Sequence, residues 1–209
     1  MNTMDTLQKL FGSAAKVKIM RLFLFNQKMV FDLDDVMARS KTGKAETRKE
    51  IALLESIGML IKRDVHKSVE VKKGKKKVFV SKKFHGWKLN DKCQYLLPLQ
   101  TFLISMMPVT KGDLAERFMK AGKIKMVVTS GVFNQYWDAR VDLLIVGDNI
   151  KKTALDNAVK GLESEVGKEL VYSVFETDDF LYRLGVCDKL VRDILDYPHE
   201  KVFNKLNII

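Results

Sequence analysis

Two groups of polar residues, nearly all basic, could bind a polyanion. The first group lies in and after the polar turn Ser40 to Gly43, and its members are Lys41, Thr42, Lys44, Arg48 and Lys49. The second group is a lysine run around Gly74, and its members are Lys72, Lys73, Lys75, Lys76 and Lys77. Lysine ammonium groups are point charges suited to phosphate oxygens, whereas the forked guanidinium of Arg48 can bond both acceptors of a guanine. We therefore predict phosphate contacts from the lysines and base recognition from Arg48, with pairing of Arg48 to Glu46 or Glu50 as the alternative.

The segments around the first group predict a bundle of three short helices. An apolar run from Ser13 to Phe25 is typical of a buried helix, with Ser13 as its N-cap. A second helix, 33–40, has acidic residues in its first turn, where the helix dipole favours them. The third helix is expected over 44–57, and Gly58 suits the left-handed residue that follows a helix. Two helices joined by a short turn containing glycine are typical of a helix-turn-helix.

After Gly58 the spacing of the apolar residues changes from the helical period to a period of two residues, which is typical of a strand. Residues 59–71 and 78–80 predict two strands, and Lys72 to Lys77 form the turn between them with Gly74 near its centre. The second lysine group then lies at the tip of a β-hairpin.

This order of elements resembles the winged helix-turn-helix domains of prokaryotic transcriptional regulators. The resemblance rests on LFGSAAKVKIMRLFL (10–24), TRKEIALLESIGMLIKRD (47–64), the hairpin and HGWKLN (85–90), and it covers roughly residues 8–90. It implies that the third helix enters the major groove of duplex DNA and that the hairpin is the wing.

The C-terminal half reads as a small α/β domain. Strands are expected at 124–129, 140–147, 170–175 and 201–206, and a helix at 153–166 separates the second and third strands. Thr110 is expected to cap a helix over 111–121, Thr177 another one, and Asp188 to Leu195 form a last short helix.

This half resembles the minimal nucleotidyltransferase domain of the polymerase-β-like superfamily. That family has a Gly-Ser pair after its first strand and a D-x-D pair on the second that holds Mg²⁺. Gly131 stands at the glycine position, but Val132 replaces the serine; Asp142 matches the first carboxylate, but Leu144 replaces the second. Magnesium needs several oxygen ligands, so we expect no metal, no cofactor and no catalytic residue, and regard Gly131 and Asp142 as vestigial.

Two aromatic segments leave alternatives open. Residues 95–107 predict an apolar helix that either forms a dimer contact or packs between the two halves. Tyr136 and Trp137 either stack on a ligand or pack against the N-terminal half.

Charge and composition narrow the class of protein. The net charge is +11, with +15 on residues 1–125 and −4 on residues 126–209, so the basic part is expected to face a polyanion. The chain has no apolar run long enough to span a membrane and no recognisable secretory signal. Two distant cysteines, Cys93 and Cys187, favour a reducing cytoplasmic setting, and three isolated histidines give no zinc pattern.

The sequence thus predicts a two-domain protein of mixed class, α+β or α/β. Residues 1–108 are expected to form a winged helix-turn-helix domain, and residues 109–209 a nucleotidyltransferase-like pseudoenzyme domain. The predicted function is a cytoplasmic, prokaryotic transcription regulator that binds double-stranded DNA and no membrane, with the second domain as sensor or oligomerisation module. A homodimer, or a protein partner bound through residues 109–209, stays open. The alternatives are an active nucleotidyltransferase and an antitoxin-like protein that binds a toxin.

Overall fold

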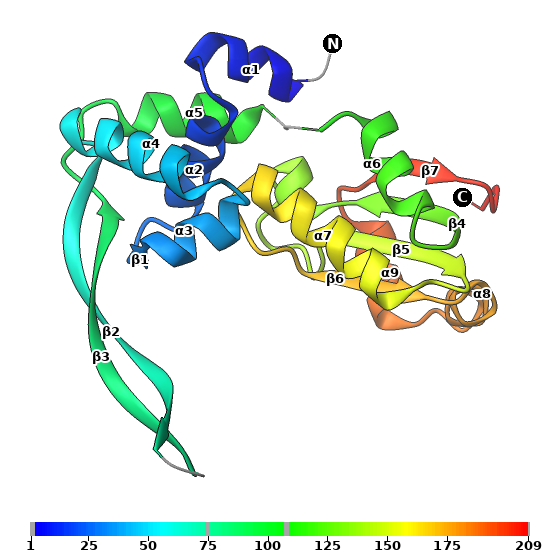
Figure 1. The fold of residues 1–209 in the computed structure, drawn as a ribbon. Helices are drawn as coiled ribbons and strands as arrows, with labels where there is room; N and C mark the ends of the chain where they lie inside the picture. Colours follow the sequence, from blue (N-terminus) through cyan, green and yellow to red (C-terminus); the bar gives the residue numbers. More distant parts are fainter. Residues whose placement is uncertain (1–2, 74–75, 107–108, 209) are drawn as a thin grey trace. The chain divides into compact units, whose positions relative to one another are not determined.

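The computed structural model describes residues 3–73, 76–106 and 109–208 of the chain. These residues form a mixed α/β protein with nine α-helices and two small sheets in the described part (Figure 1). The chain divides into two compact units. The N-terminal unit comprises Asp5–Ile104 and Ser164–Lys168, and the C-terminal unit comprises Met1–Met4, Ser105–Glu163 and Glu169–Ile209. The boundary expected at residue 108 falls on residues 107–108, which lie outside the described residues.

The first 105 residues form five helices and a three-stranded sheet in their described part. In chain order they are α1 (Thr3–Phe11), α2 (Ala14–Phe25), β1 (Phe31–Asp32), α3 (Leu33–Ser40), α4 (Lys44–Ser56), β2 (Leu60–Lys73), β3 (Lys76–Leu89) and α5 (Leu96–Ser105). Helix α1 and the two-residue strand β1 were not predicted, and β1 is too short to show a periodic pattern.

Local capping determines where these helices begin and end. The side chain of Ser13 accepts a hydrogen bond from the backbone N–H of Lys16 at 3.1 Å, which confirms the predicted N-cap of α2. Asp32 and Asp35 form a reciprocal capping box at the start of α3. Gly58 has the predicted positive φ, +73°, just after α4.

The sheet of the N-terminal unit is built on one long antiparallel hairpin. Strands β2 and β3 pair without interruption from Leu60↔Leu89 to Lys73↔Lys76, and β1 adds to β3 through Phe31↔Trp87. The predicted hairpin is therefore confirmed, but its pairing continues into the stretch that was expected to be a six-residue turn.

Apolar residues of α2, α3, α4 and the sheet form the core of this unit. Phe23 and Phe31 meet edge to face with ring centroids 5.5 Å apart, and Val36, Ile51 and Leu54 are buried beside the sheet residues Leu60 and Leu89. Helix α4 ends at Ser56, one residue before its predicted end, and its C-cap residue Ile57 is 56% exposed.

The C-terminal elements form four helices, a short 3₁₀ turn and a four-stranded sheet. In chain order they are α6 (Lys111–Met119), β4 (Lys123–Thr129), η1 (Gly131–Asn134), β5 (Leu143–Asp148), α7 (Lys152–Val166), β6 (Tyr172–Phe175), α8 (Thr177–Gly185), α9 (Lys189–Asp196) and β7 (Glu200–Asn204). Thr110 caps α6 through a capping box with Asp113, as predicted.

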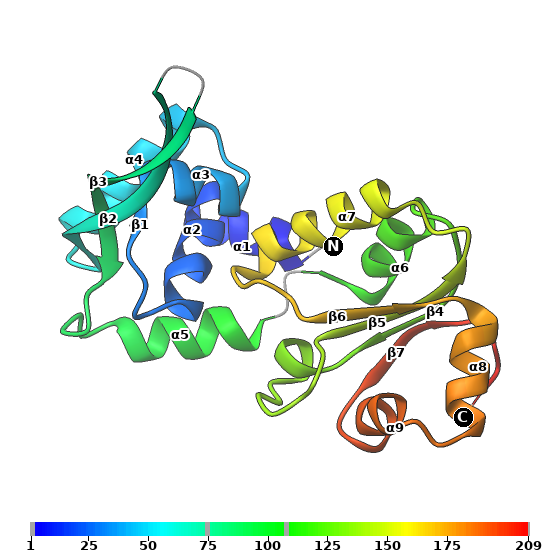
Figure 2. The same cartoon turned by 90° about the horizontal axis from the view of Figure 1, so that it is seen from below.

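The strand order of the second sheet is β6-β5-β4-β7. Strands β5 and β6 are parallel and joined through α7, whereas the β4–β5 and β4–β7 pairs are antiparallel. Helices α6 and α7 lie on one face of the sheet, and α8 and α9 lie on the other (Figure 2). Both faces are thus covered, which explains why β5 is almost entirely apolar and why β4 is buried from Met126 to Thr129.

Several predicted boundaries in this unit are wrong. Helix α6 ends at Met119 and not at residue 121, β6 begins at Tyr172 and not at residue 170, and β7 ends at Asn204 and not at residue 206. Two further errors involve segments held by distant parts of the chain. Strand β5 begins at Leu143, so Arg140, Val141 and Asp142 precede it. The N-cap of α8 is Glu176 and not Thr177, which is the first helical residue; its backbone N–H donates to Asp148 at 3.2 Å. Both segments form hydrogen bonds to distant parts of the chain, which a local sequence pattern does not predict.

Candidate functional site

A chain of hydroxyl groups holds the turn between α3 and α4. The Oγ1 atom of Thr42 lies 2.6 Å from the Oγ of Ser40 and 2.8 Å from the Oγ1 of Thr47. Ser40 in turn donates to the carbonyl of Val36, and Thr47 donates to the carbonyl of Gly43. Ser40 and Thr47 are buried, so the network fixes the angle at which α4 leaves the turn. The hydroxyl of Thr42, predicted to contact DNA, is part of this network.

The other predicted residues of the turn and of α4 are exposed; they are Lys41, Lys44, Arg48 and Lys49. Lys44 and Arg48 are four residues apart and share one side of the helix. The N-cap of α4 is Gly43, which makes no side-chain capping bond. The first backbone N–H groups of a helix without such a cap can bond an anion such as phosphate.

The alternative partner Glu50 is buried beneath α4 and does not face the surface with Arg48. Its residue is 3% exposed, and its Oε2 atom lies 3.7 Å from the Nζ of Lys16 on α2. Lys16 also donates to the carbonyl of Phe11 at 3.0 Å. Glu50 therefore belongs to the packing of α4 against α2, a role that sequence periodicity did not reveal.

The base of the hairpin is bonded to the end of α4. The indole N–H of Trp87 donates to Glu55 at 3.2 Å, and the Nζ of Lys62 lies 2.9 Å from the same carboxylate. The hydrogen bond from Lys62, and to a smaller extent the one from Trp87, hold the pKa of Glu55 below its usual value. The side-chain amide of Asn90 donates to the carbonyl of Gly58 at 2.7 Å. These bonds orient the hairpin relative to α4 within one unit.

The predicted lysines of the hairpin lie at its far end. Lys72 pairs with Lys77 and Lys73 pairs with Lys76 in the backbone register. Lys75 lies outside the described residues, as do the side chains of the other four. Their predicted phosphate contacts stay predictions.

Asp142, which was predicted to be a vestigial carboxylate, is bonded to the backbone at two places. It is 5% exposed; its Oδ1 accepts from the N–H of Val132 at 2.8 Å, and its Oδ2 accepts from the N–H of Val171 at 3.0 Å. Gly131 has a φ of +57°, and a Cβ at this position would overlap the Oδ1 of Asp142. The carboxylate thus ties together the turn after β4 and the segment before β6.

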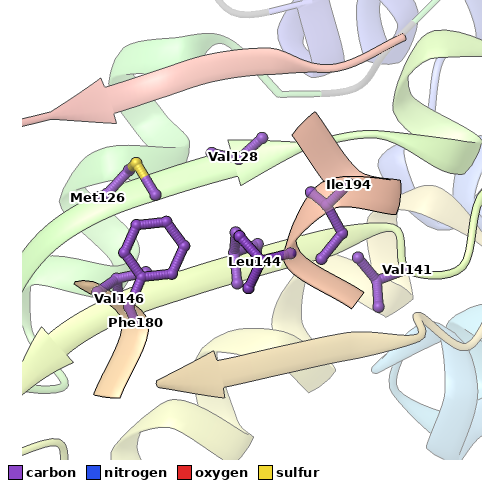
Figure 3. Close-up of a cluster of buried hydrophobic side chains, with 8 residues drawn as sticks. Met126, Val128, Val141, Leu144, Val146, Phe180 and Ile194 are labelled. Carbon is purple, nitrogen blue, oxygen red and sulfur yellow. The ribbon is translucent and has the colours of Figure 1, made fainter. Parts of the chain in front are cut away.

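Leu144, at the position where the nucleotidyltransferase resemblance implies a second carboxylate, lies in the core. It is fully buried in a cluster with Met126, Val128, Phe180 and Ile194 between the sheet and α8 and α9 (Figure 3). No group of three or more His, Cys, Asp or Glu side chains that could hold a metal ion occurs among the described residues. The acidic residues that flank the third strand, Glu169 and Glu176, are both exposed.

The two aromatic residues after η1, Tyr136 and Trp137, have different surroundings. Tyr136 stacks on Tyr197 of the same unit, with ring centroids 5.8 Å apart and an interplanar angle of 19°. Trp137 is 58% exposed. Tyr136 therefore has an aromatic partner within the C-terminal unit, and stacking of Tyr136 or Trp137 on a ligand stays a prediction.

Helix α5 packs with one side only. Leu103 is fully buried and Phe102 contacts Phe11, while Leu97 is 72% exposed. The predicted choice between a dimer contact and simple packing stays open.

Comparison with known proteins identifies no relative. No family model matches the chain, and no significant match was found among curated proteins or solved structures. None of the described helices is both long enough and apolar enough to cross a membrane.

Proposed function

We propose that the protein is a DNA-binding transcriptional regulator whose N-terminal unit is a winged helix-turn-helix. The observation that carries the proposal is the exposure of Lys41, Lys44, Arg48 and Lys49 around the start of α4. The hydroxyl network of the turn and the bonds between α4 and the hairpin base hold these cations in a defined geometry. A preorganised cationic helix start beside a β-hairpin suits one major groove and its adjacent phosphates.

The C-terminal unit is proposed to be a nucleotidyltransferase-like domain without catalytic activity. The order β4, β5, α7, β6 and the pair Gly131 and Asp142 support the relationship. The burial of Leu144 and the two backbone bonds of Asp142 support the loss of metal-dependent transfer. This unit would then act as a sensor or an oligomerisation module.

Salt-dependent binding of the full chain to duplex DNA tests the proposal. If about five or six phosphates are contacted, the logarithm of the binding constant falls with the logarithm of salt concentration with a slope of about −5. Replacing Lys73, Lys75, Lys76 and Lys77 by alanine is expected to reduce that slope by about 3 to 4. A flat salt response of the wild-type protein would overturn the proposal.

The retained Gly131 and Asp142 favour one second candidate, an active nucleotidyltransferase. Incubation with Mg²⁺ and labelled nucleoside triphosphates tests it. Transfer of label by the wild-type protein that is lost in Asp142→Asn, at a temperature where the variant is folded, would replace our proposal for the C-terminal unit.

A further inference from the structure

The two faces of the hairpin differ in charge. Side chains alternate between faces along a strand, and directly paired residues share a face. One face, here called the inner face, includes the buried Leu60 and Leu89 and the α4-bonded Trp87. The opposite face, here called the outer face, includes Arg63, Val80, Lys82 and Phe84.

In the stem, short of the tip pair Lys72 and Lys77, both lysines of the inner face are engaged by carboxylates. Lys62 lies 2.9 Å from Glu55, and Lys83 lies 2.7 Å from Asp64. The Nδ1 of His85 lies 2.8 Å from the other oxygen of Asp64. The bonds from Lys83 and then His85 hold the pKa of Asp64 below its usual value, so this carboxylate stays ionised near neutral pH. The inner face of the stem is therefore close to neutral.

The outer face has no acidic residue at any of its register positions between Leu60↔Leu89 and Lys73↔Lys76. Arg63 and Lys82 on this face are exposed. Val80, 38% exposed, and the half-buried Phe84 lie on the same face and could contact deoxyribose. At the base of this face, Lys88 lies 3.0 Å from Asp91, which lies beyond the end of β3.

The stem is also long enough to reach beyond one groove. Each strand has 14 residues. At about 3.3 Å per residue such a strand measures roughly 45 Å, more than the roughly 34 Å of one turn of B-DNA. The hairpin leaves the helices of its own unit as a two-stranded arm (Figure 1).

We propose that the outer face of the hairpin stem, through Arg63 and Lys82, binds the phosphates of a DNA duplex. The stem then adds contacts beyond those of α4 and the hairpin tip, and only one of its faces takes part. This inference rests on the proposed function, because it assumes that the N-terminal unit binds duplex DNA. Charge complementarity selects the partner: a stem face free of carboxylates suits the continuous row of anions along a duplex.

Lys82 and Lys83 provide a matched pair of variants. They are neighbours on β3, lie on opposite faces and remove the same single charge when changed to alanine. The dissociation constant of the full chain for a 30-base-pair duplex is measured by fluorescence anisotropy from 50 to 300 mM KCl, with circular dichroism as the control for folding. Lys82→Ala is expected to reduce the magnitude of the salt slope by about 0.9 and to weaken binding several-fold at 100 mM salt. Lys83→Ala is expected to keep the wild-type slope, and Arg63→Ala to behave like Lys82→Ala.

The outcomes separate this inference from the proposed function. Equal slopes for Lys82→Ala and Lys83→Ala, or a larger loss in Lys83→Ala, would overturn the assignment of the outer face while duplex binding itself stands. A wild-type protein that does not bind the duplex in a salt-dependent way would overturn both.

Discussion

The Oδ1 atom of Asp142 accepts a hydrogen bond from the backbone N–H of Val132 at 2.8 Å. The second oxygen of the same buried carboxylate accepts from Val171, so one side chain joins segments 10 and 29 residues away. A carboxylate used in this way supports the architecture of the sheet.

We expect Asp142→Ala to lower the free energy of unfolding of the C-terminal unit by about 3 kcal/mol, because the buried N–H of Val132 and the partly buried N–H of Val171 both lose their acceptor. Asp142→Asn keeps one acceptor oxygen, and its expected loss is about 2 kcal/mol. Urea unfolding followed by Trp137 fluorescence in a Trp87→Phe background reports on this unit. The control is Asp138→Asn at an exposed position, and variants as stable as that control would contradict the role of Asp142.

Gly131→Ala is expected to destabilise the same unit by about 3 kcal/mol, because it combines a left-handed φ with overlap of the carboxylate. Gly185, in α8, has nothing within 4 Å of an added Cβ, and Gly185→Ala is expected to be neutral or slightly stabilising. In a double variant with Asp142→Ala the overlap disappears, so the combined loss should be smaller than the sum of the two. Strictly additive losses would show that the overlap does not matter.

Arg48→Ala is expected to relax base preference at one position of the bound site, with a loss of about 1–3 kcal/mol in discrimination. Lys44→Ala and Lys49→Ala should weaken binding to all DNA sequences by the same factor, since phosphate contacts carry no sequence information. Selection from a random duplex library with each variant measures both effects. An unchanged preference profile in Arg48→Ala would assign Arg48 to the solvated side of α4.

The Asp64 cluster predicts a specific acid response. Since the pKa of Asp64 is lower in the folded protein than in the unfolded chain, its contribution to stability is present above the unfolded pKa of about 3.9 and is lost as pH falls through the folded pKa. The carboxyl carbon resonance of Asp64 should therefore titrate below pH 3.9, and Lys83→Ala should move the midpoint upward. A titration midpoint of Asp64 that is the same in the wild-type protein and in Lys83→Ala would contradict the ion pair.

Most helix boundaries could be predicted because they depend on neighbours three or four residues away. Ser13, Asp32 and Thr110 each bond to a backbone N–H three positions on, and Gly58 takes the left-handed conformation that ends α4. The wrong predictions at β5 and α8 concern segments whose structure depends on hydrogen bonds to distant parts of the chain. Strand β5 starts late because residues 141–142 bond to the turn after β4 and to the segment before β6, and Thr177 bonds to the end of β5.

The same distinction applies to the candidate interface. The amino-acid sequence alone determined the hairpin, the helix pair and the positions of the cations, because periodicity, capping and turn residues act locally. Only the tertiary structure decided that Glu50 is buried against Lys16, that Leu144 faces the core, and that Lys83 meets Asp64 while Lys82 lies on the opposite face. These outcomes depend on strand register and helix packing, where a shift of one residue reverses the face that a side chain occupies.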